Sequence, residues 1–186
     1  MKRLFRLQYN SPVVLTFALI SLVALWLGKL TDGWTTQYLF SVWHSSLADI
    51  LTYPRMILHV LGHTDYNHYI GNMMMILVVG PGLEEKYGSK NMISAIIITA
   101  LVSGLVHWFL FPGTMLLGAS GIVFMMIVMA SLAGMRDGRI PITLILVLIL
   151  YLGNEFVDGL TLKDNVSQLT HIIGGVCGAV LGLRRR

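Results

Sequence analysis

Apolar residues run in long, nearly uninterrupted stretches along this chain of 186 residues. A helix needs about 20 predominantly apolar residues to cross the hydrocarbon core of a bilayer. Six stretches approach this length, at residues 12–28, 66–83, 92–110, 118–135, 142–157 and 167–183. The pattern therefore predicts an all-α integral membrane protein, with six transmembrane helices in a single polytopic domain over residues 1–186.

Composition supports this class and excludes an ordinary soluble domain. Hydrophobic residues make up 55% of the chain and charged residues only 12%, and the mean hydropathy is +0.74, well outside the profile of soluble proteins. The first stretch follows Met1-Lys2-Arg3 without a small-residue cleavage site, so we expect it to be kept as a span.

The positive charges predict an orientation. Six spans put both termini on one side of the membrane, and ten of the 13 lysines and arginines fall on that side: Lys2, Arg3, Arg6, Lys86, Lys90, Arg136, Arg139, Arg184, Arg185 and Arg186. Positive residues concentrate in cytoplasmic loops, so both termini are predicted to be cytoplasmic, N-in and C-in. The net charge of +4 then reflects orientation, and no nucleic-acid partner is expected.

The longest connection is the first outer loop, residues 31–65. It contains Trp34, Tyr38, Trp43 and Tyr53, and aromatic residues of this kind gather at membrane interfaces. We expect a long, membrane-associated loop, with the other connections short.

The run Gly118-Ala119-Ser120-Gly121 lies between two apolar stretches, shortly after the helix-breaking Phe111-Pro112-Gly113. Ser120 is therefore expected to begin a helix. The free N–H groups and the positive dipole at a helix start favour negative charge developing on an oxygen, and polar groups at membrane depth are usually functional. Serine and glycine also serve helix packing in membranes, so this motif alone is a weak signal.

His171 precedes three glycines, Gly174, Gly178 and Gly182, at a spacing of four residues. This spacing puts the glycines on one face of the last span. Close packing of that face would hold His171 against a neighbouring helix. The glycines could serve helix packing alone or could also position His171 as a base, and both interpretations predict the same close contact.

A third constellation precedes and enters the second span: His59-x3-His63-x4-His68-x3-Asn72. His68 and Asn72 are four residues apart and share a helix face, so both could donate hydrogen bonds to one oxygen. They could equally be polar packing residues, and His59, His63 and His68 could form a metal site.

These motifs, in this order, resemble those of the rhomboid intramembrane serine proteases. The resemblance covers about residues 55–183 and also includes Gly80-x-Gly82-x-Glu84 followed by Gly88. It implies a six-helix rhomboid-like bundle, with Ser120 as nucleophile and His171 as general base. It further implies Asn72, His68 and the backbone N–H of Ser120 as the oxyanion hole, with Gly118, Gly121 and Gly174 as supporting glycines. No metal and no cofactor are expected.

The resemblance also implies a water-filled cavity open to the outer face. Substrates would be single-span membrane proteins, with membrane lipid around the protease. The location would be the plasma (inner) membrane of a prokaryote, and the oligomeric state stays open. Three positions differ from the familiar pattern: Thr170 stands where alanine is usual, Phe124 where some members have tyrosine, and Pro54-Arg55 where many have Trp-Arg.

Other classes fit less well. A metalloprotease would want His-Glu-x-x-His, but no His-Glu pair occurs. An aspartyl protease needs two membrane-embedded aspartates, and no such pair is visible. A histidine-lined channel or metal transporter leaves the Gly-Ala-Ser-Gly run unexplained. A catalytically dead rhomboid-like binding protein should lack Ser120 or His171, and this chain keeps both.

Overall fold

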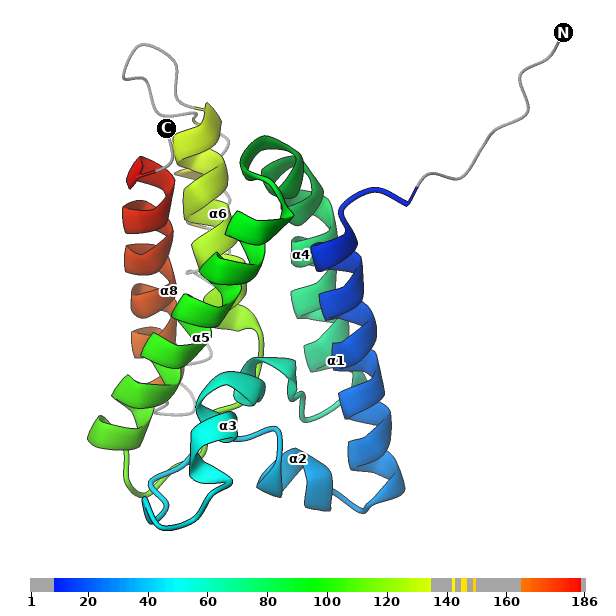
Figure 1. The fold of residues 1–186 in the computed structure, drawn as a ribbon, viewed down its shortest axis with the longest axis vertical. Helices are drawn as coiled ribbons and strands as arrows, with labels where there is room; N and C mark the ends of the chain where they lie inside the picture. Colours follow the sequence, from blue (N-terminus) through cyan, green and yellow to red (C-terminus); the bar gives the residue numbers. More distant parts are fainter. Residues whose placement is uncertain (1–8, 135–141, 143–144, 147–148, 150–164, 185–186) are drawn as a thin grey trace, which may run out of the picture.

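The computed structural model describes residues 9–134, 142, 145–146, 149 and 165–184. Five long helices form the bundle (Figure 1): α1 (Pro12–Leu30), α4 (Tyr66–Tyr87), α5 (Ser89–Leu110), α6 (Ser120–Gly134) and α8 (Asn165–Arg184). They occupy five of the six predicted spans, and most of the remaining one, residues 142–157, lies outside the described residues. Across the described ranges there is no β-strand, only one bridge between Val42 and Leu116, so the all-α class is confirmed there.

Within the described residues, two helices, α1 and α5, are long and apolar enough to cross a membrane by length and composition; α6 is apolar but shorter. α1 begins and α8 ends at the same end of the bundle, and α6 begins part-way along its height (Figure 1). The arrangement agrees with termini on one side of a membrane. The number of spans and the N-in, C-in orientation stay predictions.

The second connection is much shorter than hydropathy indicated. The predicted spans 66–83 and 92–110 leave residues 84–91 as the connection between them, but α4 continues to Tyr87 and α5 begins at Ser89, which leaves Gly88 alone between the two helices. Glutamate and lysine are good helix formers, so the helices continue beyond the point where the apolar pattern stops. Gly88 has φ +80°, a conformation that side-chain-bearing residues rarely adopt.

Glu84 joins the ends of three helices. The backbone N–H groups of Val13 and Val14, in the first turn of α1, donate to its two carboxylate oxygens at 3.0 Å each. The Ser89 hydroxyl, at the start of α5, donates to the same group at 2.7 Å. Ser11, which precedes α1, makes no side-chain cap, so the cap of α1 comes from α4, some 70 residues away in the chain.

The first outer loop folds into short helices: α2 (Trp34–Tyr38), α3 (Thr52–Leu58) and the 3₁₀ turn η1 (His59–Leu61). Arg55 is buried and fixes the loop, because its Nε donates to the Tyr38 carbonyl and its Nη1 to Asp49 at 2.8 Å. Its guanidinium also lies 4.1 Å from the centre of the Trp43 ring. Trp34 and Tyr53 are exposed, and contact of this loop with a membrane stays a prediction.

α6 is the central helix of the described bundle. It packs on α8 more extensively than any other helix pair does, and it also contacts α4 and α5. Nearly all its residues from Gly121 to Met129 are buried. This burial explains why its apolar character runs all round the helix rather than along one stripe.

Candidate active site

Ser120 is the first residue of α6 and is half-buried. The segment before it is held by backbone hydrogen bonds to the first outer loop. Leu116 and Val42 exchange two bonds of 2.9 Å, and the Gly118 N–H donates to the His59 carbonyl at 2.9 Å. The hydroxyl of Ser120 therefore stands at a helix start whose position is fixed from two sides.

Gly118 cannot carry a side chain for two independent reasons. Its φ is +121°, in the region that favours glycine, and an added Cβ would lie 2.8 Å from Nε2 of His68. The same close approach places the His68 imidazole next to the segment that leads into Ser120. These two features explain why a glycine stands at position 118, and its role as a supporting glycine of the site stays a prediction.

His171 lies on α8 and is buried, with 2% of its surface exposed. Its imidazole stacks on the ring of Phe124, with centroids 4.6 Å apart and planes 16° apart. Phe124 is four residues after Ser120 on α6, and residues at this spacing lie on the same helix face. The stacking therefore puts His171 beside the face of α6 that carries both Ser120 and Phe124.

Glycine packing brings α8 this close. A Cβ at Gly174 would overlap the carbonyl oxygen of Gly121, and one at Gly178 would meet the Met125 backbone. On the other side, a Cβ at Gly121 would lie 3.1 Å from Cγ2 of Thr170. The predicted packing face of the last span is confirmed, and its partner is α6.

His68 and Asn72 occupy the first turns of α4. Asp65 caps this helix by accepting a hydrogen bond of 3.0 Å from the His68 N–H, and Thr64 Oγ1 lies 3.2 Å from His68 Nδ1. Asn72 is buried; its Nδ2 donates to the His68 carbonyl at 3.0 Å, and its Oδ1 has no partner. The amide keeps one N–H beyond the bond to His68.

Two further histidines are oriented by backbone carbonyls. His59 Nε2 lies 3.1 Å from the Ala100 oxygen, and His63 Nδ1 lies 3.1 Å from the Leu61 oxygen. The pKa of each is lowered to about 4, chiefly by burial, and the nearby His68 contributes to the lowering at His63. In the part of the chain that the structure describes, no three His, Cys, Asp or Glu side chains come together to hold a metal ion.

A cavity of about 590 Å³ lies beside this region. Its walls include His63, Thr64 and Leu117, together with Lys29 at the end of α1 and Asp32 in the turn that follows. Leu117 directly precedes Gly118, so the cavity reaches the segment that leads into Ser120. The space is open on one side, and apolar residues such as Leu25 and Met115 line it together with the polar ones.

Sequence reasoning missed three residues near the site. Thr64 and Asp65 precede the second predicted span as a capping sequence, which was the available signal for their contacts with His68. The third is Ser103 on α5, whose Oγ would lie 3.7 Å from a Cβ at Gly121. Ser103 sits in a uniformly apolar stretch, and nothing in that pattern indicates that it approaches α6.

The fold and the site define a class: an all-helical protein, with apolar helices suited to a membrane, in which a serine at a helix start has a histidine on the adjacent helix. The family model described as Rhomboid domain matches residues 51–186. The chain therefore belongs to the rhomboid family, a family of intramembrane proteases, and this membership and the apolar helices indicate a membrane protein. A comparison with curated proteins finds no match.

Proposed function

We propose that the protein is an active intramembrane serine endopeptidase, which hydrolyses peptide bonds in or near the transmembrane segments of membrane-protein substrates. Family membership supports the protease class. One observation carries the assignment of residues: the His171 ring is seated on Phe124, one helical turn beyond Ser120. A histidine held at this position lies close to the start of α6, where it could accept the proton of the Ser120 hydroxyl.

In the proposed reaction, His171 takes the proton of Ser120 while Oγ attacks the carbonyl carbon of the substrate peptide bond. The carbonyl oxygen becomes an oxyanion in the tetrahedral intermediate. Collapse of this intermediate breaks the C–N bond, and His171 returns the proton to the leaving amine. His171 then takes a proton from water as the water attacks the ester on Ser120, and it returns this proton to Oγ of Ser120 as the ester C–O bond breaks and the second product leaves.

The oxyanion would be bound by the Ser120 N–H, Asn72 and His68. Nε2 of His68 is a donor only when it carries a proton, and this depends on Thr64. The Thr64 hydroxyl donates to Oδ2 of Asp65 at 2.8 Å and lies 3.2 Å from His68 Nδ1. Because its one hydrogen is used on Asp65, the hydroxyl can only accept from His68, so Nδ1 carries a proton. Nε2 can then donate to the oxyanion only when the imidazole is protonated on both nitrogens.

We further propose that the site opens to the outer face of the plasma membrane of a prokaryote, with both termini cytoplasmic, and that the substrates are single-span membrane proteins. Entry would involve the fifth predicted span and residues 158–166, which lie mostly outside the described residues. A reporter that works only in the cytoplasm should be active when it is fused after Arg186. Activity there of a reporter that works only outside the cell would contradict this topology.

The direct test is cleavage of a model single-span substrate by the reconstituted protein. Ser120→Ala should abolish cleavage, and Ser131→Ala, on the same helix, should keep it. A fluorophosphonate probe should label the wild type and lose its target in both Ser120→Ala and His171→Ala. Equal cleavage by wild type and Ser120→Ala would exclude Ser120 as the nucleophile.

The oxyanion assignment has its own test. Asn72→Ala should lower turnover by roughly 10²–10³, whereas Asn67→Ala, at an exposed position of the same helix, should have little effect. Full activity of Asn72→Ala would leave Asn72 with a packing role only.

A further inference from the structure

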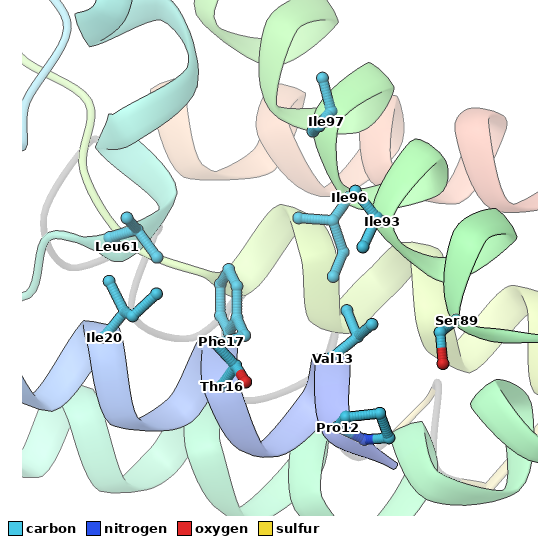
Figure 2. Close-up of a pocket in the computed structure, with 10 residues that line it drawn as sticks. All are labelled: Pro12, Val13, Thr16, Phe17, Ile20, Leu61, Ser89, Ile93, Ile96 and Ile97. Carbon is cyan, nitrogen blue, oxygen red and sulfur yellow. The ribbon is translucent and has the colours of Figure 1, made fainter.

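A second recess in the described part of the molecule lies away from Ser120, between α1 and α5, and is almost wholly apolar. It has a volume of about 460 Å³ and is open along one side. Figure 2 shows the side chains of both helices pointing into it, with Leu61 of η1 at one end and Ser89 at the other. α1 packs mainly on α4 and touches α5 at few positions, so this recess separates the two helices.

The walls provide nothing for a polar ligand. Thr16 and Ser89 are the only wall residues with polar side chains, and the hydroxyl hydrogen of Ser89 is already donated to Glu84. The apolar surface continues on both sides, because Val23 of α1 and Ile98 of α5 are exposed too. In a membrane, both helices would present this surface to lipid chains.

The length of this recess, a groove between α1 and α5, distinguishes a lipid acyl chain from a transmembrane helix of a substrate as its occupant. It runs from Pro12 to Ile20 on α1 and from Ser89 to Ile97 on α5, which is about 12 Å along each helix at 1.5 Å per residue. The hydrocarbon core is about 30 Å thick. The groove thus has the depth of one leaflet, and a spanning helix of a substrate would need a groove about twice as long.

Charge at the mouth of the groove points to the headgroup. Lys90 is exposed and lies three and seven residues before Ile93 and Ile97, on the same face of α5 as these two wall residues. It therefore stands at the end where Pro12 and Ser89 lie. An ammonium group at the membrane surface attracts anionic lipids.

We propose that the groove between α1 and α5 binds one acyl chain of an anionic phospholipid, with the lipid phosphate next to Lys90. The lipid comes from the leaflet at which α1 begins. It fills the gap between two helices that have little direct contact, and so it bridges α1 and α5. The proposal goes beyond the proteolytic function and does not depend on it.

The test uses the full chain in detergent and native mass spectrometry, with phosphatidylglycerol and phosphatidylcholine of identical acyl chains as probes. Ile97→Trp fills the groove. Ile98→Trp is the matched control, because Ile97 and Ile98 are each 43% exposed and only Ile97 lines the groove. Ile97→Trp should weaken retention of phosphatidylglycerol at least about fivefold through lost van der Waals contact, and Ile98→Trp should leave it unchanged.

A second pair of variants tests the headgroup. Lys90→Gln should remove the preference for phosphatidylglycerol over phosphatidylcholine, about fivefold, whereas Arg184→Gln, an exposed charge on α8, should keep it. Ile20→Trp fills the groove from α1 and replaces Ile97→Trp if that variant does not fold.

Equal retention by the groove-filling variants and Ile98→Trp would overturn the site. Equal retention of both lipids by the wild type would overturn the anionic headgroup. A transmembrane substrate peptide that loses binding in Ile97→Trp, with lipid retention unchanged, would overturn the lipid in favour of a substrate helix.

Discussion

Gly174→Ala tests how the site is assembled, because it adds one methyl group at the closest contact between α6 and α8. The new Cβ would overlap the carbonyl oxygen of Gly121 and approach its carbonyl carbon and Cα. Contacts of a Cβ under 3.0 Å are essentially never seen, and backbone atoms cannot rotate away as a flexible side chain can. The two helices must therefore separate, by roughly 1 Å.

The consequences for stability and turnover differ in size. Overpacking of a tight interface costs about 1–3 kcal/mol, partly offset by about 1 kcal/mol because alanine is the better helix former. His171 lies three residues before Gly174 and moves with α8. Since a displacement of about 1 Å in a catalytic group can cost about 10² in rate, we expect Gly174→Ala to lose about 100-fold in turnover while remaining folded.

Gly175→Ala is the control for this change. A Cβ there would meet only Cγ2 of Val128 at 3.9 Å, an ordinary contact, so this variant should be as active as the wild type and equally or more stable. The assays are cleavage of a model transmembrane substrate and the midpoint of thermal unfolding in detergent. Equal turnover of Gly174→Ala and Gly175→Ala would refute the claim that close packing of α8 on α6 positions the base.

Three further predictions concern the surroundings of the site. Glu84→Ala should lower the free energy of unfolding by about 2 kcal/mol, because it leaves helix-start N–H groups without an acceptor, whereas the exposed Glu85→Ala should change it by less than about 0.5 kcal/mol in the same denaturation assay. Thr64→Val should raise kcat at alkaline pH relative to the wild type without changing KM, since His68 Nδ1–H would lose the oxygen that accepts from it and the neutral ring could carry its proton on Nε2; a pH profile of kcat equal to that of the wild type would argue against His68 Nε2 as an oxyanion donor. His63 has a folded-state pKa of about 4 against 6.5 for the free side chain, so between these values the unfolded chain binds the proton and stability should fall as the pH is lowered; unfolding curves of His63→Gln should show a weaker decline over this pH range.

The sequence was sufficient for features that depend on local periodicity. The start of α6 at Ser120 followed from the helix breaker before it, and the glycines from Gly174 onward followed from a spacing of four residues. The extent of α4 was mispredicted, because hydropathy marks the edge of a membrane while helix propensity decides where a helix ends. Glu84 shows this most clearly: it reads as the first residue of a loop, yet it is buried inside a helix and caps another one.

What the sequence could not supply is register between helices, and the site depends on it. The contacts around His68 are local, since Thr64, Asp65 and the first turn of α4 are adjacent in the chain, and their capping pattern can be recognised from spacing alone. The placement of His171 depends instead on which turn of α6 meets the glycine face of α8, and many registers satisfy the same spacing. The structure selects one in which Gly174 meets Gly121, so that the ring of His171 lies on Phe124. In this register the backbones of α6 and α8 touch at Gly174 and Gly121, with no room for a further atom. The methyl group added by Gly174→Ala is therefore expected to lower turnover more strongly than it lowers the stability of the fold.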